Sequence, residues 1–189
     1  LQEIASALVG TPAALGLLPS GRCNDLARAL GFLPGAKLRE LVAILLQGVT
    51  RSIDVGCLEP LTPHARLGQA DQRPASQRAE AKFFCTVATL GFDSQVNRFV
   101  EQHRLPFRGT AAYLYALVRV LIDFRCPHVR LRGDFGEFDG RVLLAATGNT
   151  PFYGGAMQIA PGAQVNDGLF HVCIVRAVPR RTVVRILPK

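Results

Sequence analysis

Residues 21–25 combine residue types that could bind a phosphate group. Gly21 follows the apolar stretch "GLLPS", and Asn24 and Asp25 open a segment with the pattern of a helix. Backbone N–H groups at a helix N-terminus carry partial positive charge, and Arg22 could add a charge-assisted bond to a phosphate oxygen. The alternative is that Asn24 or Asp25 only caps the helix, and this stretch taken alone favours the cap.

A glycine-rich segment, "TGNTPFYGGAMQIAPGAQVNDGLFHV" at 147–172, is the second place that could carry chemistry. Gly154 and Gly155 indicate a close backbone approach, either to another strand or to a ligand. Asn166-Asp167-Gly168 is typical of a hairpin turn, and its spacing alone favours that interpretation. The alternative is a Mg²⁺ site made by the Asp167 carboxylate and nearby carbonyl groups.

Arg51 and Asp54 form a third polar pair in the sequence. In a strand, an odd spacing places two side chains on opposite faces, so these two need not pair. We expect both to be surface or interdomain residues.

The elements that must position these residues change in character along the chain. The first 48 residues show helical patterns at 3–9, 24–30 and 35–48, and an apolar stretch at 13–19 that predicts a strand buried on both faces. The helix at 35–48 carries an amphipathic stripe that includes Leu41 and Leu45. This pattern indicates an α/β arrangement.

From residue 49 onward the pattern is predominantly β. Two strands are expected on either side of a polar loop at 61–80, and the strand that runs to Thr89 is broken at Gly91. One long helix is expected at 109–124. Strands then follow in "HVRLRG", "GEFDG", "RVLLAATGN", "GAMQIAPG" and "GLFHVCIVRAV", with a hairpin turn in "GDFGEFDG".

Composition limits the class of protein. Apolar residues make up 49% of the 189, which indicates a globular chain. The net charge of +8 favours anionic partners, although the arginine-rich tail "RAVPRRTVVRILPK" could equally be a solvated face. Aromatic residues are not interleaved with the basic ones, so nucleic acid is not expected as a partner. The five scattered cysteines predict buried free thiols in a reducing cytoplasm rather than a zinc site.

Taken in order, "LPSGRCNDLARALG", "ATLGFDSQV", "GTAAYLY", "TGNTPFYGGAMQIAPGA" and "NDGLFHV" resemble the diacylglycerol kinase catalytic family. The most similar branch is that of the bacterial soluble lipid kinases, related to sphingosine and ceramide kinases. The resemblance runs from Leu1 to about Val178. It implies a fold that is α/β plus β-rich: the remnant of a Rossmann-like nucleotide-binding domain at 1–48, then a β-sandwich-like domain with one long helix at 49–189.

The resemblance also implies roles for residues in two segments, 21–25 and 147–172. Gly21, Asn24 and Asp25 match the second nucleotide-binding motif of the family, roughly G-T-x-N-D, and Arg22 stands where the family has a threonine. A magnesium ion would be held by the side chain of Asp167 and by the carbonyl groups of two neighbours, Gln164 and Leu169.

Two family motifs are not found in the 189 residues. The GGDGT nucleotide loop would precede Leu1, and the general base, in a D-G-E motif, is expected beyond Lys189. The chain is therefore expected to be a fragment with little or no kinase activity alone.

The implied reaction is transfer of the γ-phosphoryl group of ATP, with Mg²⁺, to the hydroxyl of diacylglycerol or a similar lipid alcohol, giving a phosphatidic-acid-type product. A sphingosine- or ceramide-type kinase is one alternative. A catalytically weak regulator that binds nucleotide or acidic membrane is another, and a basic nucleic-acid-binding domain is the weakest. The expected location is the cytoplasm, with peripheral contact to an acidic membrane surface and a possible homodimer.

Overall fold

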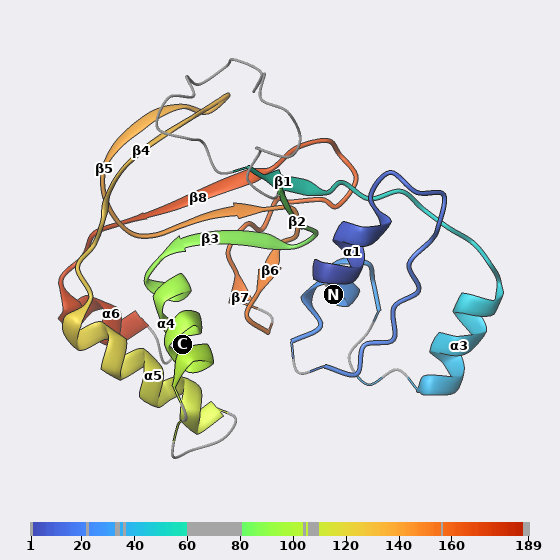
Figure 1. Ribbon diagram of the computed structural model, residues 1–189, viewed down its shortest axis with the longest axis horizontal. Helices are drawn as coiled ribbons and strands as arrows, with labels where there is room; N and C mark the ends of the chain where they lie inside the picture. Colours follow the sequence, from blue (N-terminus) through green and yellow to red (C-terminus); the bar gives the residue numbers. More distant parts are fainter. Residues whose placement is uncertain are drawn as a thin grey trace. The chain divides into compact units, whose positions relative to one another are not determined.

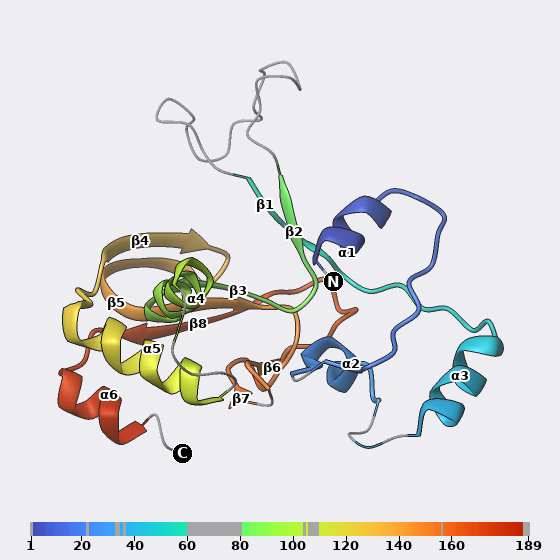
Figure 2. The same ribbon diagram turned by 60° about the horizontal axis from the view of Figure 1, so that its bottom comes forward.

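The computed structural model forms two compact units, which Figures 1 and 2 show in two orientations. Unit 1 comprises Leu1–Val87 and Gly148–His171, and unit 2 comprises Ala88–Thr147 and Val172–Lys189. Unit 1 is thus assembled from two separate stretches of chain, whereas the sequence predicted a boundary near residue 48. The structure describes residues 2–21, 23–32, 35, 37–59, 81–103, 105, 110–155 and 157–186.

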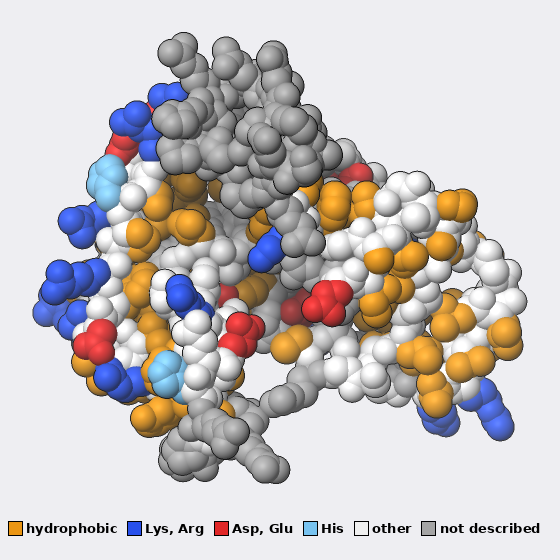
Figure 3. Space-filling view, in the orientation of Figure 1, with side chains coloured by type: hydrophobic (Ala, Val, Ile, Leu, Met, Phe, Trp, Pro, Cys, Tyr) orange, Lys and Arg blue, Asp and Glu red, His pale blue; other side chains and the backbone are white. Residues whose placement is uncertain are grey.

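The three helices of unit 1 lie where the sequence predicted helices: α1 (Gln2–Leu8), α2 (Asp25–Ala29) and α3 (Leu38–Leu46). The apolar stripe of α3 is largely exposed, since Leu41 alone is buried, and Figure 3 shows apolar side chains over this helix. Apolar periodicity therefore predicted the helix but not its burial.

The strand predicted at 13–19 is wrong. This segment forms neither helix nor strand and pairs with no strand among the described residues. Leu15 and Leu18 are 38% and 47% exposed, so neither is in a core. A strand exists only through its ladder partners, and local apolar character cannot supply them.

Two short hairpins complete unit 1. Strands β1 (Gly56–Leu58) and β2 (Lys82–Phe84) pair antiparallel, so the two strands expected around the polar loop are confirmed, while 60–80 lies outside the described residues. The second hairpin pairs β6 (Phe152–Tyr153) with β7 (Met157–Gln158). A small core joins α1, α2 and the residue after β2, through Ala5, Leu26 and Cys85.

The cysteines are less buried than the sequence predicted. All five are free, but Cys23 and Cys57 are exposed and Cys85 alone is buried. Burial raises the pKa of the Cys85 thiol, so this group stays protonated and packs as a small apolar side chain.

A four-stranded sheet forms the framework of unit 2. Its order is β3 (Val87–Gly91), β5 (Gly136–Gly148), β4 (His128–Gly133), and β8 (His171–Arg176) also pairs with β5. The predicted hairpin turn is confirmed, because Gly133 pairs with Gly136 across two residues.

Charged side chains pair across the β4–β5 hairpin. The Arg130 Nε donates to Asp139 Oδ2 at 2.8 Å, and this bond holds the pKa of the Asp139 carboxyl below its usual range. These groups are exposed, so the pair contributes little to stability.

Three helices pack together in unit 2: α4 (Phe92–Gln102), α5 (Thr110–Asp123) and α6 (Arg180–Ile186). The long helix predicted at 109–124 is α5, whereas α4 and α6 were not predicted. Their shared core contains Phe92, Val96, Ala116, Leu117, Leu121 and Val183. The spacing of Phe92, Val96 and Phe99 in the sequence could have indicated α4.

Gly91 makes the abrupt change from β3 to α4 possible. Its φ is 114° and its ψ is −137°, a backbone conformation that side chains with a Cβ rarely adopt. A Cβ added there would lie 2.5 Å from the carbonyl oxygen of Leu143 on β5. The glycine is thus required both by its backbone angles and by the neighbouring strand.

We expect Gly91→Ala to lower the free energy of unfolding by about 2 kcal/mol or more, because backbone strain and overlap with Leu143 add together. Gly136→Ala is the matched control: its φ is 102°, but a Cβ there meets nothing within 4 Å. The control should lose about 1 kcal/mol in urea unfolding. Equal losses for the two variants would contradict the role assigned to Leu143.

Candidate nucleotide and cation site

The Asn24 side chain closes a tight turn instead of capping α2. Its Oδ1 accepts the Gly21 N–H at 3.0 Å, and its Nδ2 donates to the carbonyl groups of Gly21 at 2.6 Å and Pro19 at 3.3 Å. The backbone of Asn24 is left-handed, with φ 51°, and no side-chain cap is made to the helix. The helix-cap interpretation is therefore wrong for Asn24. Arg22 lies outside the described residues.

Asp25 connects this turn to the glycine-rich segment. Both of its carboxylate oxygens accept the Gly155 N–H, each at 3.2 Å, from a position 130 residues away in the sequence. Gly154 and Gly155 have φ values of 61° and 95°, which turn the chain tightly at this contact. The double glycine thus makes the close approach that the sequence indicated, and it does so toward the predicted nucleotide-binding residues.

A cation–π contact supports the same approach. The guanidinium carbon of Arg28, on α2, lies 5.6 Å from the centre of the Phe152 ring on β6. In Figure 2, α2 lies beside the β6–β7 hairpin.

Asn149 is fully buried and joins the two stretches of unit 1. Its Nδ2 donates to the carbonyl groups of Asp54 at 2.7 Å and Cys85 at 3.0 Å, and its backbone N–H donates to Thr86 at 2.7 Å. Its Oδ1 has no hydrogen-bond partner among the described residues. The sequence analysis did not single out Asn149, although a polar residue directly after a long apolar strand was a usable signal.

Asp54 holds the predicted cation turn. Its backbone N–H donates to the carbonyl of Val165 at 2.6 Å, and its Oδ2 accepts the Gly168 N–H at 2.7 Å. The prediction that Asp54 is a surface or interdomain residue is therefore wrong: it is partly buried inside unit 1. Arg51 bonds elsewhere, to the carbonyl of Leu30 at 3.0 Å.

The residues predicted to bind magnesium lie in an exposed turn. Asp167 Oδ1 accepts the Leu169 N–H at 3.0 Å, and Gly168 has a φ of 72°. The other Asp167 oxygen accepts no hydrogen bond from the described residues, and Gln164 and Leu169 are exposed. The segment before Phe170 forms no strand, so the Asp-Gly turn does not join two paired strands.

This donor set fits a hydrated magnesium ion. One carboxylate oxygen and two backbone carbonyls are hard ligands, and Mg²⁺ commonly keeps several waters beside one or two carboxylates. Among the described residues, no group of three or more His, Cys, Asp and Glu side chains could hold a metal. The assignment of Gln164, Asp167 and Leu169 therefore stays a prediction.

Unit 2 contains a buried carboxylate that the sequence analysis missed. Asp93, two residues after Gly91, is 6% exposed. It accepts hydrogen bonds from Thr89 Oγ1 at 3.1 Å, Asn97 Nδ2 at 3.3 Å and Tyr113 OH at 3.2 Å. These bonds fasten the start of α4 to β3 and α5.

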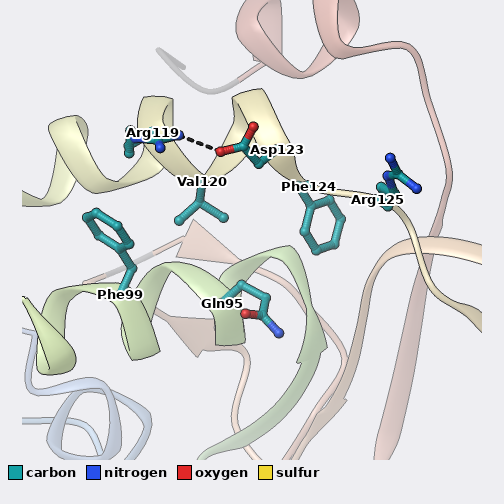
Figure 4. A pocket seen from close by; sticks show the side chains of 7 residues that line it. All are labelled: Gln95, Phe99, Arg119, Val120, Asp123, Phe124 and Arg125. Carbon is teal, nitrogen blue, oxygen red and sulfur yellow. Dashed lines mark hydrogen bonds and ion pairs between the residues drawn. The ribbon is translucent and has the colours of Figure 1, made fainter.

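A groove of 360 Å³ also lies in unit 2, between α4 and α5 (Figure 4). Phe99, Val120 and Phe124 give it an apolar lining, and the Arg119–Asp123 ion pair lies on its α5 side. It contains none of the residues predicted to bind nucleotide or metal.

Comparisons with known proteins match both parts of the chain. Residues 1–58 match the family model described as the diacylglycerol kinase catalytic domain. Residues 86–189 match the model described as the YegS C-terminal NAD kinase beta sandwich-like domain.

Individual relatives agree with the family models. The chain is 32% identical over 182 residues to a protein named diacylglycerol kinase from Mycobacterium tuberculosis, covering 96% of this chain and 53% of that protein. It is 32% identical over 179 residues to a protein named "Probable lipid kinase YegS-like" from Pseudomonas putida, covering 94% of this chain and 52% of the other. The chain thus spans about half the length of these curated relatives.

Solved structures show the same fold. A diacylglycerol kinase structure from Bacillus anthracis has a TM-score of 0.52 at 17% identity, covering 90% of this chain and 48% of the other. A second structure from that organism has a TM-score of 0.61 at 16% identity, covering 98% and 55%. The fold and the two family matches therefore place this chain in the diacylglycerol kinase catalytic family, in the branch that carries the YegS-type second domain. The resemblance stated from the sequence motifs is confirmed.

None of the helices in the described part of the chain has the length and apolar character of a membrane span.

We expect Asn149→Asp to lower the free energy of unfolding by about 3 kcal/mol or more, because a carboxylate would face two buried carbonyl groups that now receive an N–H. Asn166→Asp, at an exposed position of the same segment, should change it by less than about 0.5 kcal/mol. Urea unfolding measures both. Equal midpoints for the two variants would show that Asn149 does not join the two stretches of unit 1.

Proposed function

We propose that a protein carrying this chain is an ATP-dependent lipid kinase. It transfers the γ-phosphoryl group of ATP to the hydroxyl of diacylglycerol or a similar lipid alcohol, and the product is of the phosphatidic-acid type. Family membership and the names of the relatives support a kinase acting on a lipid. The observation that carries the proposal is the bond from the Gly155 N–H to Asp25. This bond joins residues 21–25 to the glycine-rich segment 147–172, the two places that the sequence analysis singled out for chemistry.

The proposed roles follow from the chemistry of phosphoryl transfer, which depends on positioning and on neutralising charge at the phosphate oxygens. Gly21, in the turn closed by Asn24, has no side chain and would let the nucleotide come close to the backbone, and Arg22 would supply positive charge. Asp25 would orient the Gly154–Gly155 turn toward the same ligand. The general base is not assigned.

Magnesium would bind at the exposed turn of Gln164, Asp167 and Leu169, where it would supply positive charge. The contribution of the chain there is the pair of bonds from Asp54, which hold Val165 and Gly168 in place. We place the reaction at the cytoplasmic surface of an acidic membrane, because a basic chain is attracted to anionic lipid.

The proposal is tested with the protein in a form as long as its curated relatives. Isothermal calorimetry with Mg-ATP should show binding, and labelled ATP with diacylglycerol should give labelled lipid. Asp25→Ala should weaken Mg-ATP binding about tenfold, because it removes the bonds that hold the Gly155 turn.

Asp134→Ala, in the β4–β5 turn, is the matched control and should leave binding unchanged. The 189-residue chain alone should phosphorylate little or no lipid. The absence of heat with Mg-ATP in the longer form would end the proposal. A panel with sphingosine and ceramide in place of diacylglycerol decides between the lipid alcohols.

A regulator without strong kinase activity is the second candidate, and Arg22 is the observation that favours it. The family has a hydroxyl-bearing threonine at this position, and an arginine cannot make the same short contact. If the protein is an enzyme that uses the arginine, Arg22→Thr should raise the KM for ATP, because the positive charge beside the phosphate is lost. The rise should stay below about tenfold, because threonine is the residue of the family at this position. An inactive wild type with an active Arg22→Thr variant would instead support the regulator.

A further inference from the structure

Helix α5 is apolar on the side that faces solvent as well as on the side that faces the core. Ala116, Leu117 and Leu121 are buried against α4 and α6. Away from this core, large side chains are strongly exposed: Leu114 at 56%, Val118 at 58% and Ile122 at 55%. Tyr115, at 41%, lies at the edge of this face, with its ring centroid 6.5 Å from that of Phe99 on α4. A helix that is apolar all round is normally covered on every side, so this face is a candidate docking surface.

The exposed residues form a continuous stripe. Leu114, Val118 and Ile122 are spaced by four residues, which places them above one another along one side of the helix over about 12 Å. The two charged residues of α5, Arg119 and Asp123, pair with each other beside the groove. The stripe itself therefore carries no charge.

Cationic side chains border one end of this stripe. Arg125 follows α5 and is exposed, and Arg180 and Arg181 are exposed at the start of α6. Arg180 donates to the carbonyl of Phe124 at 3.4 Å, which places its guanidinium at the C-terminal end of α5. None of these three arginines makes an ion pair with the described residues. Figure 3 shows apolar side chains at this edge of the molecule, with Lys and Arg side chains close by.

The size of the surface argues against a second copy of the chain. A stable interface buries about 800 Å² on each partner, and four partly exposed side chains offer roughly half of that or less. A flat apolar stripe with an aromatic residue and a cationic border is instead the pattern of a helix lying in the interface of an anionic bilayer.

We propose that the outer face of α5, with Leu114, Tyr115, Val118 and Ile122, docks on an acidic lipid bilayer, and that Arg125, Arg180 and Arg181 bind its anionic headgroups. This inference deepens the proposed function, since it names the surface by which a lipid kinase would reach a substrate held in a membrane. Docking itself requires neither ATP nor catalysis.

The absence of tryptophan from the chain makes a direct probe possible. Val118→Trp would place a single tryptophan in the stripe, and Phe135→Trp would place one at the tip of the β4–β5 hairpin, where the wild-type residue is similarly exposed at 52%. With vesicles of phosphatidylcholine and phosphatidylglycerol, the tryptophan emission of the Val118→Trp variant should shift to shorter wavelength, while that of the Phe135→Trp variant should not.

Vesicle co-sedimentation of the 189-residue chain tests the two parts of the surface separately. The double variant Leu114→Gln/Val118→Gln should bind acidic vesicles at least about tenfold more weakly than wild type, and Phe135→Gln should bind as wild type does. Arg180→Gln/Arg181→Gln should lose about tenfold on acidic vesicles and nothing on pure phosphatidylcholine. Circular dichroism checks that each variant is folded.

Equal vesicle binding by wild type and the double variant would overturn the inference, as would an equal emission shift from both tryptophan variants. Self-association without lipid that the double variant abolishes would assign the face to a second copy. Vesicle binding without ATP binding would count against the proposed kinase and not against docking. Kinase activity on detergent-dispersed lipid without vesicle binding would count against docking alone.

Discussion

The buried amide of Asn149 is the interaction on which unit 1 depends. A polar side chain with no exposed surface is costly unless its donors are used, and both hydrogens of this amide are donated to backbone carbonyl groups, of Asp54 and Cys85. Those carbonyls belong to the first stretch of unit 1, whereas Asn149 belongs to the second. Using both donors of this side chain therefore requires that residues 64 and 95 positions before Asn149 in the chain lie next to it.

Both turns are held in the same way. Asp25 accepts the N–H of Gly155, and Asp54 accepts the N–H of Gly168. In each case an acidic side chain of the first stretch binds a glycine of the second, and in each case the glycine has a positive φ. Bonds to a carboxylate are stronger than neutral ones, so two acidic residues can hold both turns in place. The two segments proposed to bind nucleotide and magnesium thus share one supporting network, through Asp25, Asp54 and Asn149.

Unit 2 is held together by an apolar core instead of a buried amide. Its sheet and helices enclose a core around Val96 and Leu117, and Gly91 and the buried Asp93 fix the direction in which α4 leaves β3. The same packing turns the other side of α5 outward, with its apolar residues uncovered and arginines at its end. We propose the membrane as the partner of this face, because relatives of the chain are named diacylglycerol kinase and lipid kinase.

The sequence by itself determined the helices at α1, α2, α3 and α5, the strands of the β4–β5 hairpin, and, through ordered motifs, the family. These features follow from local periodicity, from turn residues, and from motifs that occur in a fixed order along the chain. Tertiary structure alone decided that 13–19 is not a strand, that Asp54 is partly buried, and that Asn24 closes a turn instead of capping a helix. It also decided that Asp25 reaches Gly155. The positions of 13–19, Asp54 and Asp25 depend on partners distant in the chain, which no local pattern encodes. The Asn24 turn is local, but whether Asn24 closes it or caps the helix depends on a left-handed backbone, and residue type alone does not decide that.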